Sequence, residues 1–301
     1  MGICEGRIAI VTGAGRGLGH AHAVELARQG ARVVVNDLGV DRDGTGRDTA
    51  TAQAVVDEIR AAGGDAVANG DDIADWDGAA RLVATALDTY GGLDVLVNNA
   101  GFVRDRMVVS TSEDEWDAVI RVHLKGHFAP TRHAGSYWRD RSKAGDPVDG
   151  RVINTSSGAG LLGSVGQGAY SAAKAGIAAL TLVEAAELGR YGVTANALAP
   201  SARTRMTEAV FAETMAKPTA GFDAMDPANI SPLVAWLAST DSADVTGRVF
   251  EVEGGTVSVA DGWHHGPGRD RGDRWDAAEL GPVVRELLAG LRGPDPVYGS
   301  S

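Results

Sequence analysis

The chain of 301 residues carries 28 Lys and Arg against 40 Asp and Glu, a formal net charge of −12, and a single cysteine. One cysteine excludes an internal disulfide scaffold, and the acidic balance argues against binding to nucleic-acid phosphates or to an anionic membrane surface. With 44% hydrophobic and 23% charged residues, the composition is that of an ordinary globular protein with one large core. No export signal or membrane-length apolar run is visible, so we expect a cytoplasmic protein.

Short apolar runs alternate with longer segments in which apolar residues recur every three or four positions. In chain order the expected strands are 8–12, 32–37, 65–69, 93–98, 151–155, 193–198 and 249–252, and the expected helices are 17–29, 49–62, 77–90, 113–139, 169–190 and 227–239. This alternation predicts an α/β fold, a doubly wound parallel sheet of about seven strands with helices on both faces.

The repeating pattern predicts one domain over residues 1–256. The remaining residues, 257–301, form a C-terminal extension rich in Gly, Arg and Asp, with one short amphipathic helix near 283–291. We expect this extension to pack on the same domain or on a neighbouring subunit, because one side of its helix is apolar.

A glycine-rich turn follows the first expected strand directly and opens the first expected helix. Its residues are Gly13, Gly15, Arg16, Gly17, Leu18 and Gly19. Glycines allow the backbone to approach a pyrophosphate closely, and the N–H groups at the helix start favour negative charge. The turn therefore predicts a nucleotide site, with a tight structural turn as the alternative.

Asp37 ends the second expected strand, about 20 residues beyond the glycines. A carboxylate there would accept hydrogen bonds from the adenosine ribose hydroxyls and would repel a 2′-phosphate. This favours NAD over NADP, although Arg16 is a cation that could act in the opposite sense. The alternative is that Asp37 only ends the strand.

Tyr170 and Lys174 lie four positions apart in a helical pattern, so their side chains share one helix face. An ammonium group beside a phenol stabilises the phenolate and lowers its pKa, which makes the tyrosine usable as an acid or base. Ser157, at the end of an expected strand, can converge on the same point.

The glycine turn, the Asn-Asn-Ala-Gly segment 98–101, Ser157, Tyr170 with Lys174, and Pro200 with Thr204 together resemble the short-chain dehydrogenase/reductase family, over about residues 6–256. The resemblance implies a single Rossmann-type domain in which Tyr170 exchanges a proton with the substrate oxygen and Ser157 holds that oxygen. It implies that Lys174 binds the nicotinamide ribose and tunes the tyrosine. It also implies cofactor contacts from Asp72, Ile73, Asn99, Ala100, Gly101, Pro200 and Thr204, besides Tyr170 and Lys174, and a homo-oligomer, dimer or tetramer.

His123 departs from the family pattern, which usually has an asparagine at this position to place a water in the proton relay. The relay could run through the His123 backbone carbonyl or its imidazole, or the residue could be structural. A catalytically silent nucleotide-binding scaffold is therefore kept as an alternative.

Segments 34–39, 66–69, 104–106, 122–126 and 199–207 are similar to the (3R)-hydroxyacyl-CoA dehydrogenase unit of peroxisomal-type multifunctional β-oxidation enzymes, and to related hydroxysteroid dehydrogenases. That subgroup also carries His at the place of His123. The resemblance implies NAD-dependent interconversion of a secondary alcohol and a ketone on a bulky apolar small molecule, a 3-hydroxyacyl-CoA or a hydroxysteroid. An NADPH-dependent 3-oxoacyl-carrier-protein reductase is the second enzymatic hypothesis.

The segment between Arg205 and Asp226 is rich in adaptable apolar side chains: Met206, Phe211, Met215, Phe222 and Met225. In the family this segment covers the substrate, and such side chains suit an acyl chain or a steroid; ordinary helix packing is the alternative. We predict no metal site: His20 and His22 are two apart at the start of a helix and point to different faces, and His264 with His265 has no Cys, Asp or Glu at ligand spacing nearby.

Overall fold

The computed structural model describes residues 2–40, 46, 48, 50–204 and 215–300. Its centre is a sheet with the strand order β3-β2-β1-β4-β5-β6-β7-β8. The strands are β1 (Ile8–Thr12), β2 (Arg32–Asn36), β3 (Asp65–Asn69), β4 (Val95–Asn98), β5 (Gly150–Thr155), β6 (Val193–Ser201), β7 (Val249–Glu253) and β8 (Thr256–Ala260). Strands β1 to β7 are paired in parallel. The predicted doubly wound Rossmann-type sheet is confirmed.

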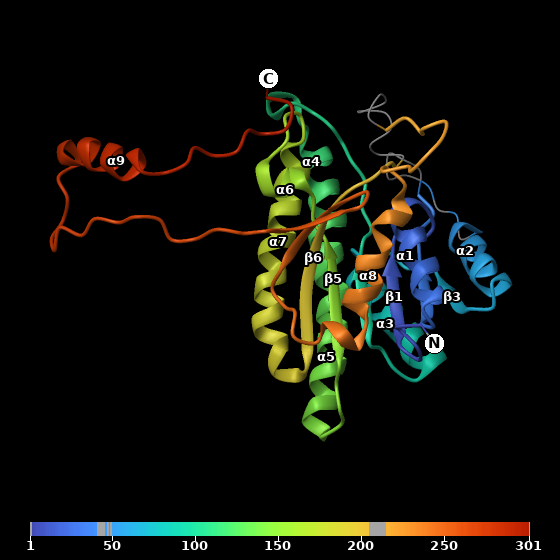
Figure 1. Cartoon of the computed structure of the whole chain (residues 1–301). Helices are drawn as coiled ribbons and strands as arrows, with labels where there is room; N and C mark the ends of the chain where they lie inside the picture. The colour runs from blue at the N-terminus through green and yellow to red at the C-terminus, as the bar shows by residue number, and fades with distance from the viewer. Residues whose placement is uncertain (1, 41–45, 47, 49, 205–214, 301) are drawn as a thin grey trace.

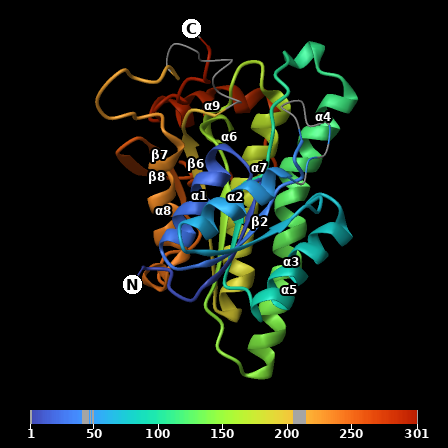
Figure 2. The same ribbon diagram turned by 90° about the vertical axis from the view of Figure 1, so that its right-hand side faces the viewer.

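Helices cover both faces of this sheet (Figures 1 and 2). In chain order the described helices are α1 (Gly17–Arg28), α2 (Ala50–Ala61), α3 (Trp76–Tyr90), α4 (Glu113–Ile120), α5 (Gly126–Ala144), α6 (Gly158–Leu162), α7 (Gly168–Leu188), α8 (Ser231–Ala238) and, away from the sheet, α9 (Leu280–Ala289). One apolar core contains side chains of α1, α2 and α8, such as Leu26, Val55 and Val234. The other contains side chains of α3 and α5, such as Leu82 and Trp138. Strands buried on both faces explain the continuous apolar runs in the sequence.

The eighth strand was not predicted. Strand β8 pairs antiparallel with β7 from Glu253↔Thr256 to Val249↔Ala260, so the sheet continues beyond the boundary expected at residue 256. Gly254 and Gly255 connect the two strands, and Gly254 has φ +53°. Two glycines between alternating runs are a known hairpin signal, which could have located this strand.

The long helix expected over 113–139 is interrupted. Helix α4 ends at Ile120, a π-helical turn follows over Arg121–Lys125, and α5 begins at Gly126. The interruption contains His123, which it carries into the interior with 1% of its surface exposed. Single π-helical turns within helices are frequent at functional sites. Periodicity alone did not distinguish this turn from a continuous helix.

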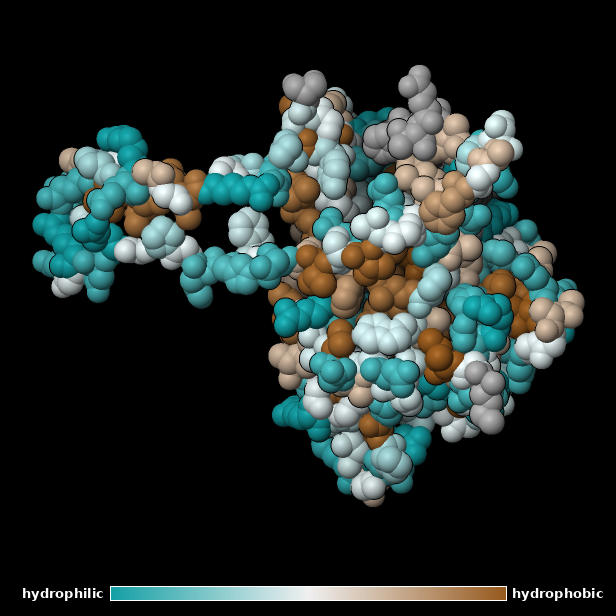
Figure 3. Space-filling model, viewed as in Figure 1, coloured by the Kyte–Doolittle hydropathy of each residue, from teal (hydrophilic) through white to brown (hydrophobic). Residues whose placement is uncertain are grey.

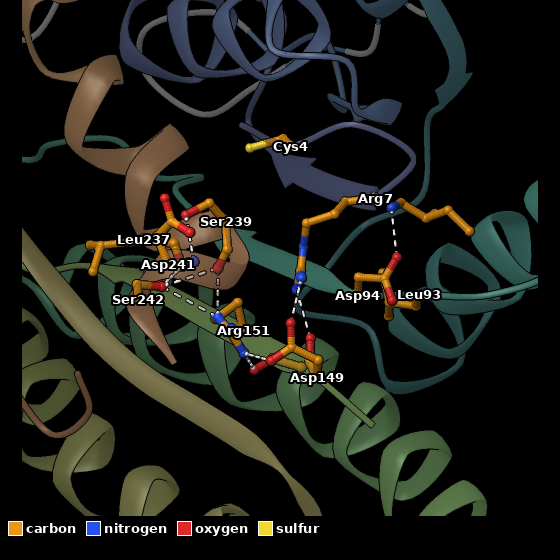
Figure 4. Close-up of polar contacts among 12 residues, drawn as sticks. Cys4, Arg7, Leu93, Asp94, Asp149, Arg151, Leu237, Ser239, Asp241 and Ser242 are labelled. Carbon is orange, nitrogen blue, oxygen red and sulfur yellow. Dashed lines mark hydrogen bonds and ion pairs between the residues drawn. The ribbon is translucent and has the colours of Figure 1, made fainter. Parts of the chain in front are cut away.

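A charged cluster at the amino ends of the central strands joins the buried Arg7 and Arg151 through the exposed Asp149 (Figure 4). The carboxylate of Asp149 accepts from Arg7 at 2.6 Å and from Arg151 at 2.5 Å. The Arg151 side chain, 1% exposed, also donates to the carbonyl of Ser239 at 3.1 Å. Cys4 lies nearby, and burial raises the pKa of its thiol to about 11, which makes it an unreactive core residue. Catalytic sites of such sheets lie at the opposite, carboxyl end of the strands.

The C-terminal extension leaves the domain after β8. Helix α9 is described completely and none of its residues is buried; in Figure 1 it lies well away from the sheet, and Figure 3 shows apolar side chains on this projecting arm. The chain then returns to the domain near α6, where Val165 N–H donates to the carbonyl of Tyr298. Across the described ranges, no helix has the length and apolar character needed to traverse a bilayer.

Candidate active site

A cavity of about 1070 Å³ lies at the carboxyl ends of the parallel strands. The strand order reverses between β1 and β4, the place where doubly wound sheets bind their ligands. The cavity is lined by nearly all the predicted site residues: Gly13, Arg16, Gly17, Leu18, Gly19, Asp37, Asp72, Ile73, Asn99, Ala100, Gly101, His123, Ser157, Tyr170, Lys174, Pro200 and Thr204. Of the predicted set only Gly15 is not among the lining residues.

The glycines of the first turn are required by its geometry. Gly13 has φ +62°, and a Cβ there would lie 2.6 Å from the Cα of Ala100. At Gly19 a Cβ would lie 2.2 Å from the carbonyl oxygen of Gly13. Gly17 has φ +56° and faces Thr204. A Cβ on Gly17 would lie 3.7 Å from the nearest atom of the Thr204 side chain. Positions 13 and 19 therefore accept only glycine in this packing, and the turn places the N–H groups at the start of α1 at the cavity.

Asp37 is held by the same turn. One of its carboxylate oxygens accepts from Gly15 N–H at 2.8 Å and the other from Gly39 N–H at 2.7 Å. A Cβ on Gly15 would lie 2.8 Å from the Asp37 carboxylate carbon. Gly15 therefore acts behind the cavity wall, where it lets the carboxylate approach the turn.

Thr12 is a positioning residue that the sequence analysis missed. Its buried hydroxyl accepts from the N–H groups of Asn99 and Ala100, at 2.9 and 3.1 Å. The Asn99 amide donates in return to the carbonyls of Thr12 and Gly13, at 2.9 and 3.2 Å. These bonds fix the loop after β4 against the glycine turn. A threonine directly before the first glycine was the available signal.

Asp72 and Ile73 connect the site to the π-helical turn. Asp72 forms an ion pair with Arg121 at 2.6 Å and accepts from Ala74 N–H at 2.8 Å. Ile73 is buried, and its side chain would lie 2.8 Å from a Cβ on Gly126, the first residue of α5. The loop after β3 and the start of α5 therefore pack tightly together.

Ser157, Tyr170 and Lys174 converge on one wall of the cavity. Ser157 follows β5 and caps α6, accepting from Ala159 N–H at 3.2 Å. Tyr170 and Lys174 occupy successive turns of α7, and the Lys174 Nζ lies 5.6 Å from the centre of the phenol ring. Lys174 is 2% exposed and donates to the carbonyl of Thr155 at 2.5 Å.

The expected lowering of the Tyr170 pKa was wrong for this arrangement. Burial raises the pKa of the phenol, a hydrogen bond with Ser157 opposes that rise, and the charge of Asp105 adds to it. Burial also lowers the pKa of Lys174 to about 7. The prediction counted the attraction between ammonium and phenolate but omitted the cost of desolvating both charges.

His123 packs against Tyr170. Its ring is perpendicular to that of Tyr170, with 5.2 Å between the centres. Its Nε2 lies 2.6 Å from the carbonyl oxygen and 3.1 Å from the N–H of Phe102. Burial lowers its pKa to about 3, so the ring is neutral at pH 7. A Cβ on Gly101 would lie 2.2 Å from this ring, which explains the glycine.

The other end of the cavity is built from two loops that bond to each other. Arg106 N–H donates to the carbonyl of Gly166 at 2.7 Å, and the Gln167 amide donates to Asp105 at 2.9 Å. Gln167 and Tyr298 line the cavity and were not predicted. Tyr298 carried no sequence signal, since it is more than a hundred residues from Ser157.

Of the apolar side chains expected to cover the substrate, Met215 is buried and lines the cavity. Phe222 is 67% exposed, and Met225 is partly buried outside the lining. Met206 and Phe211 lie outside the described residues. Within the part of the chain that the structure describes, no three His, Cys, Asp or Glu side chains gather in a way that would hold a metal.

The sheet, the glycine turn at the reversal of strand order, and the Ser-Tyr-Lys wall define an oxidoreductase that acts on CH–OH groups. The chain belongs to the short-chain dehydrogenase family, whose model matches residues 7–214.

Within this class, the chain is similar to several particular proteins. The chain is 47% identical to hydroxyacyl-CoA dehydrogenase ChsB1 of Mycobacterium tuberculosis, over 99% of this chain and 93% of that protein. It is 43% identical to peroxisomal multifunctional enzyme type 2 of Mus musculus, over 94% of this chain but 34% of that longer protein. A crystal structure of a short chain dehydrogenase from Mycobacterium avium shares 64% identity and superposes with a TM-score of 0.89, covering 99% of this chain and all of that one.

Proposed function

We propose that the protein is an NAD-dependent dehydrogenase that oxidises the 3-hydroxyl group of a hydroxyacyl-CoA thioester to the ketone. One observation carries the proposal: Ser157, Tyr170 and Lys174 line the same cavity as Asp37 and the glycine turn. The name of the relative from Mycobacterium tuberculosis, a hydroxyacyl-CoA dehydrogenase, supports a hydroxyacyl-CoA substrate.

The cavity residues fit a dinucleotide. The glycines at 13 and 19 let the turn pack closely against itself and the loop after β4, and α1 begins there with its N–H groups, which favour a pyrophosphate. Asp37 would supply a carboxylate for the adenosine ribose, and Lys174 and Thr204 would hold the nicotinamide part. The bound dinucleotide would supply a hydride acceptor for the carbinol carbon.

The protein's own groups handle the proton. The Ser157 hydroxyl donates a hydrogen bond to the substrate oxygen, while the Tyr170 phenolate takes the hydroxyl proton as the C–H bond breaks. The products are a ketone, protonated Tyr170 and reduced cofactor. Lys174, with a pKa of about 7, changes its protonation state in the neutral range one helical turn from the phenol. His123 holds the ring of Tyr170 by edge contact.

A second candidate is an NADPH-dependent 3-oxoacyl-carrier-protein reductase. It is favoured by 39% identity to the 3-oxoacyl-[acyl-carrier-protein] reductase of Synechocystis, over 83% of this chain and 97% of that one. Arg16 also lines the cavity and offers a positive charge beside the ribose end. Asp37 opposes this candidate, because its carboxylate repels a 2′-phosphate.

Turnover measurements separate these candidates. Wild type and Tyr170→Phe are assayed with a medium-chain 3-hydroxyacyl-CoA and a hydroxysteroid, each with NAD and NADP. We expect the thioester with NAD to give the highest kcat/KM and the variant to lose nearly all of it. A higher kcat/KM with NADP than with NAD would favour the reductase. A higher kcat/KM for the hydroxysteroid than for the thioester would replace the proposed substrate class. Equal rates for wild type and Tyr170→Phe would support the catalytically silent scaffold.

We also propose that the protein works as a homo-oligomer in which a second copy covers α9. Its apolar stripe includes Leu280, Val284 and Leu288, which are 38%, 47% and 59% exposed. A helix of ten residues is marginal in water without such a partner.

A further inference from the structure

The last residues of the chain form part of the cavity wall. Tyr298 N–H donates to the carbonyl of Gly163 at 3.2 Å, and Val165 N–H donates to the carbonyl of Tyr298 at 2.9 Å. Tyr298 thereby forms a parallel bridge with Ser164. In Figure 1 the C-terminus lies beside α6, on the opposite side of the sheet from α2. Because main-chain atoms make these bonds, the position of the segment does not depend on the Tyr298 side chain.

The Tyr298 ring lies directly over the residue after Ser157. A Cβ on Gly158 would lie 2.9 Å from the Tyr298 hydroxyl oxygen and 3.0 Å from its Cε2. Only a glycine at 158 allows this approach. Tyr298 lines the cavity together with Ser157, Tyr170 and Gln167, so an aromatic ring forms one boundary of the space around the reacting carbon.

Tyr298 is on the substrate side of the cavity. Asp37, at the ribose end, follows β2, whereas Ser157 follows β5; these strands lie on opposite sides of the β1–β4 reversal. The glutamates of β7 lie near the Tyr298 ring as well, since Glu251 and Glu253 act with burial to raise the pKa of its hydroxyl. The ring is therefore an uncharged, flat surface beside Ser157 and away from the ribose.

We propose that Tyr298 is a specificity-determining residue that limits the bulk of the substituent next to the carbinol carbon, and so selects straight-chain over branched or ring-bearing secondary alcohols. The proposal rests on the proposed dehydrogenase function and adds the shape of the acyl group to it. A planar ring leaves a slot for an extended methylene chain, and a branch next to the carbinol carbon would meet the ring.

The test compares wild type, Tyr298→Ala, Tyr298→Phe and Val297→Ala. Val297 is the matched control, since it neighbours Tyr298 in the same segment but does not line the cavity. Substrates are straight and branched 3-hydroxyacyl-CoA thioesters and the corresponding pairs of simple secondary alcohols. We expect Tyr298→Ala to raise the ratio of kcat/KM for the branched substrate to kcat/KM for the straight substrate by about tenfold or more. Tyr298→Phe and Val297→Ala should leave this ratio near the wild-type value.

An unchanged ratio in Tyr298→Ala, or the same shift in Val297→Ala, overturns the proposal. If wild type turns over the simple alcohols but no thioester, the proposed substrate class fails while the alcohol pairs still test Tyr298. Calorimetric Kd values for the matching straight and branched ketones, measured with cofactor present, give the same ratio without turnover. Absence of the shift in those Kd values also overturns the proposal.

Discussion

Lys174 lies one helical turn from Tyr170, with its Nζ 5.6 Å from the centre of the phenol ring and its hydrogen bond directed to the carbonyl of Thr155. The amine is thus held beside the ring without bonding to the hydroxyl. In the proposed reaction this position would let the ammonium stabilise negative charge on the phenolate. Desolvation nevertheless has the largest effect on both groups: it raises the pKa of Tyr170 and lowers the pKa of Lys174.

The pH dependence of alcohol oxidation tests the role of Tyr170. Because the phenolate accepts the proton and burial raises the pKa of the phenol, we expect kcat/KM for oxidation to rise as the pH increases toward the alkaline range. Tyr170→Phe should lower kcat by about 10²- to 10⁴-fold, the usual contribution of general acid–base catalysis. Stopped-flow measurement of cofactor reduction from pH 6 to 10 provides the profile, and a flat wild-type profile would contradict the assignment.

Asp37 should determine the choice of cofactor. Removing its carboxylate in Asp37→Ala eliminates two ribose hydrogen bonds and the repulsion of a 2′-phosphate, so the NAD to NADP ratio of kcat/KM should fall by about tenfold or more, the size of one or two charged hydrogen bonds. Asp57→Asn, an exposed change on α2, is the matched control. Equal loss with both cofactors would show that Asp37 only supports the turn.

Glu184 should make stability fall as the pH rises. It is 5% exposed, accepts from the Asn154 amide at 2.7 Å, and burial raises its pKa to about 7. Between the unfolded pKa of 4.5 and about 7 the folded protein holds a proton that the unfolded chain releases, so the free energy of unfolding decreases over this window. The total decrease is about 3 kcal/mol, from 1.36 kcal/mol per pKa unit.

Glu184→Gln removes this titration. Relative to wild type, the variant should gain stability between pH 5 and pH 8, measured by denaturant unfolding at each pH. Glu187→Gln on the exposed side of the same helix should not gain. An identical pH dependence in wild type and Glu184→Gln would mean that the buried carboxyl titrates as it does in the unfolded chain.

The arm bearing α9 should control assembly. Val284→Asp with Leu288→Asp places two carboxylates on the exposed apolar stripe and should lower the mass measured by light scattering toward that of one chain of 31.0 kDa. Arg285→Gln on the same helix should leave the mass unchanged. If the double variant keeps the wild-type mass above one chain, other surfaces hold the oligomer; a wild-type mass of one chain would remove the proposal.

Much of the site could be predicted because its residues are near one another in sequence or at the ends of predicted strands. Tyr170 and Lys174 share a helix face by their spacing alone. Asp37 and the glycine turn end successive strands, and parallel strands bring their carboxyl ends to one edge. These predictions required only local periodicity and the rule for parallel sheets.

The remaining features depend on contacts between distant segments. Tyr298 reaches Gly158 across 140 positions of the chain, and the π-helical turn around His123 has no periodicity that marks it. The direction of the Tyr170 pKa depends on how completely the fold removes water, which composition does not reveal. Amino-acid order alone determined the seven parallel strands, the glycine turn and the Tyr170–Lys174 pair, because short-range geometry dictates them. Tertiary structure decided burial, and with it the charge states and the shape of the cavity.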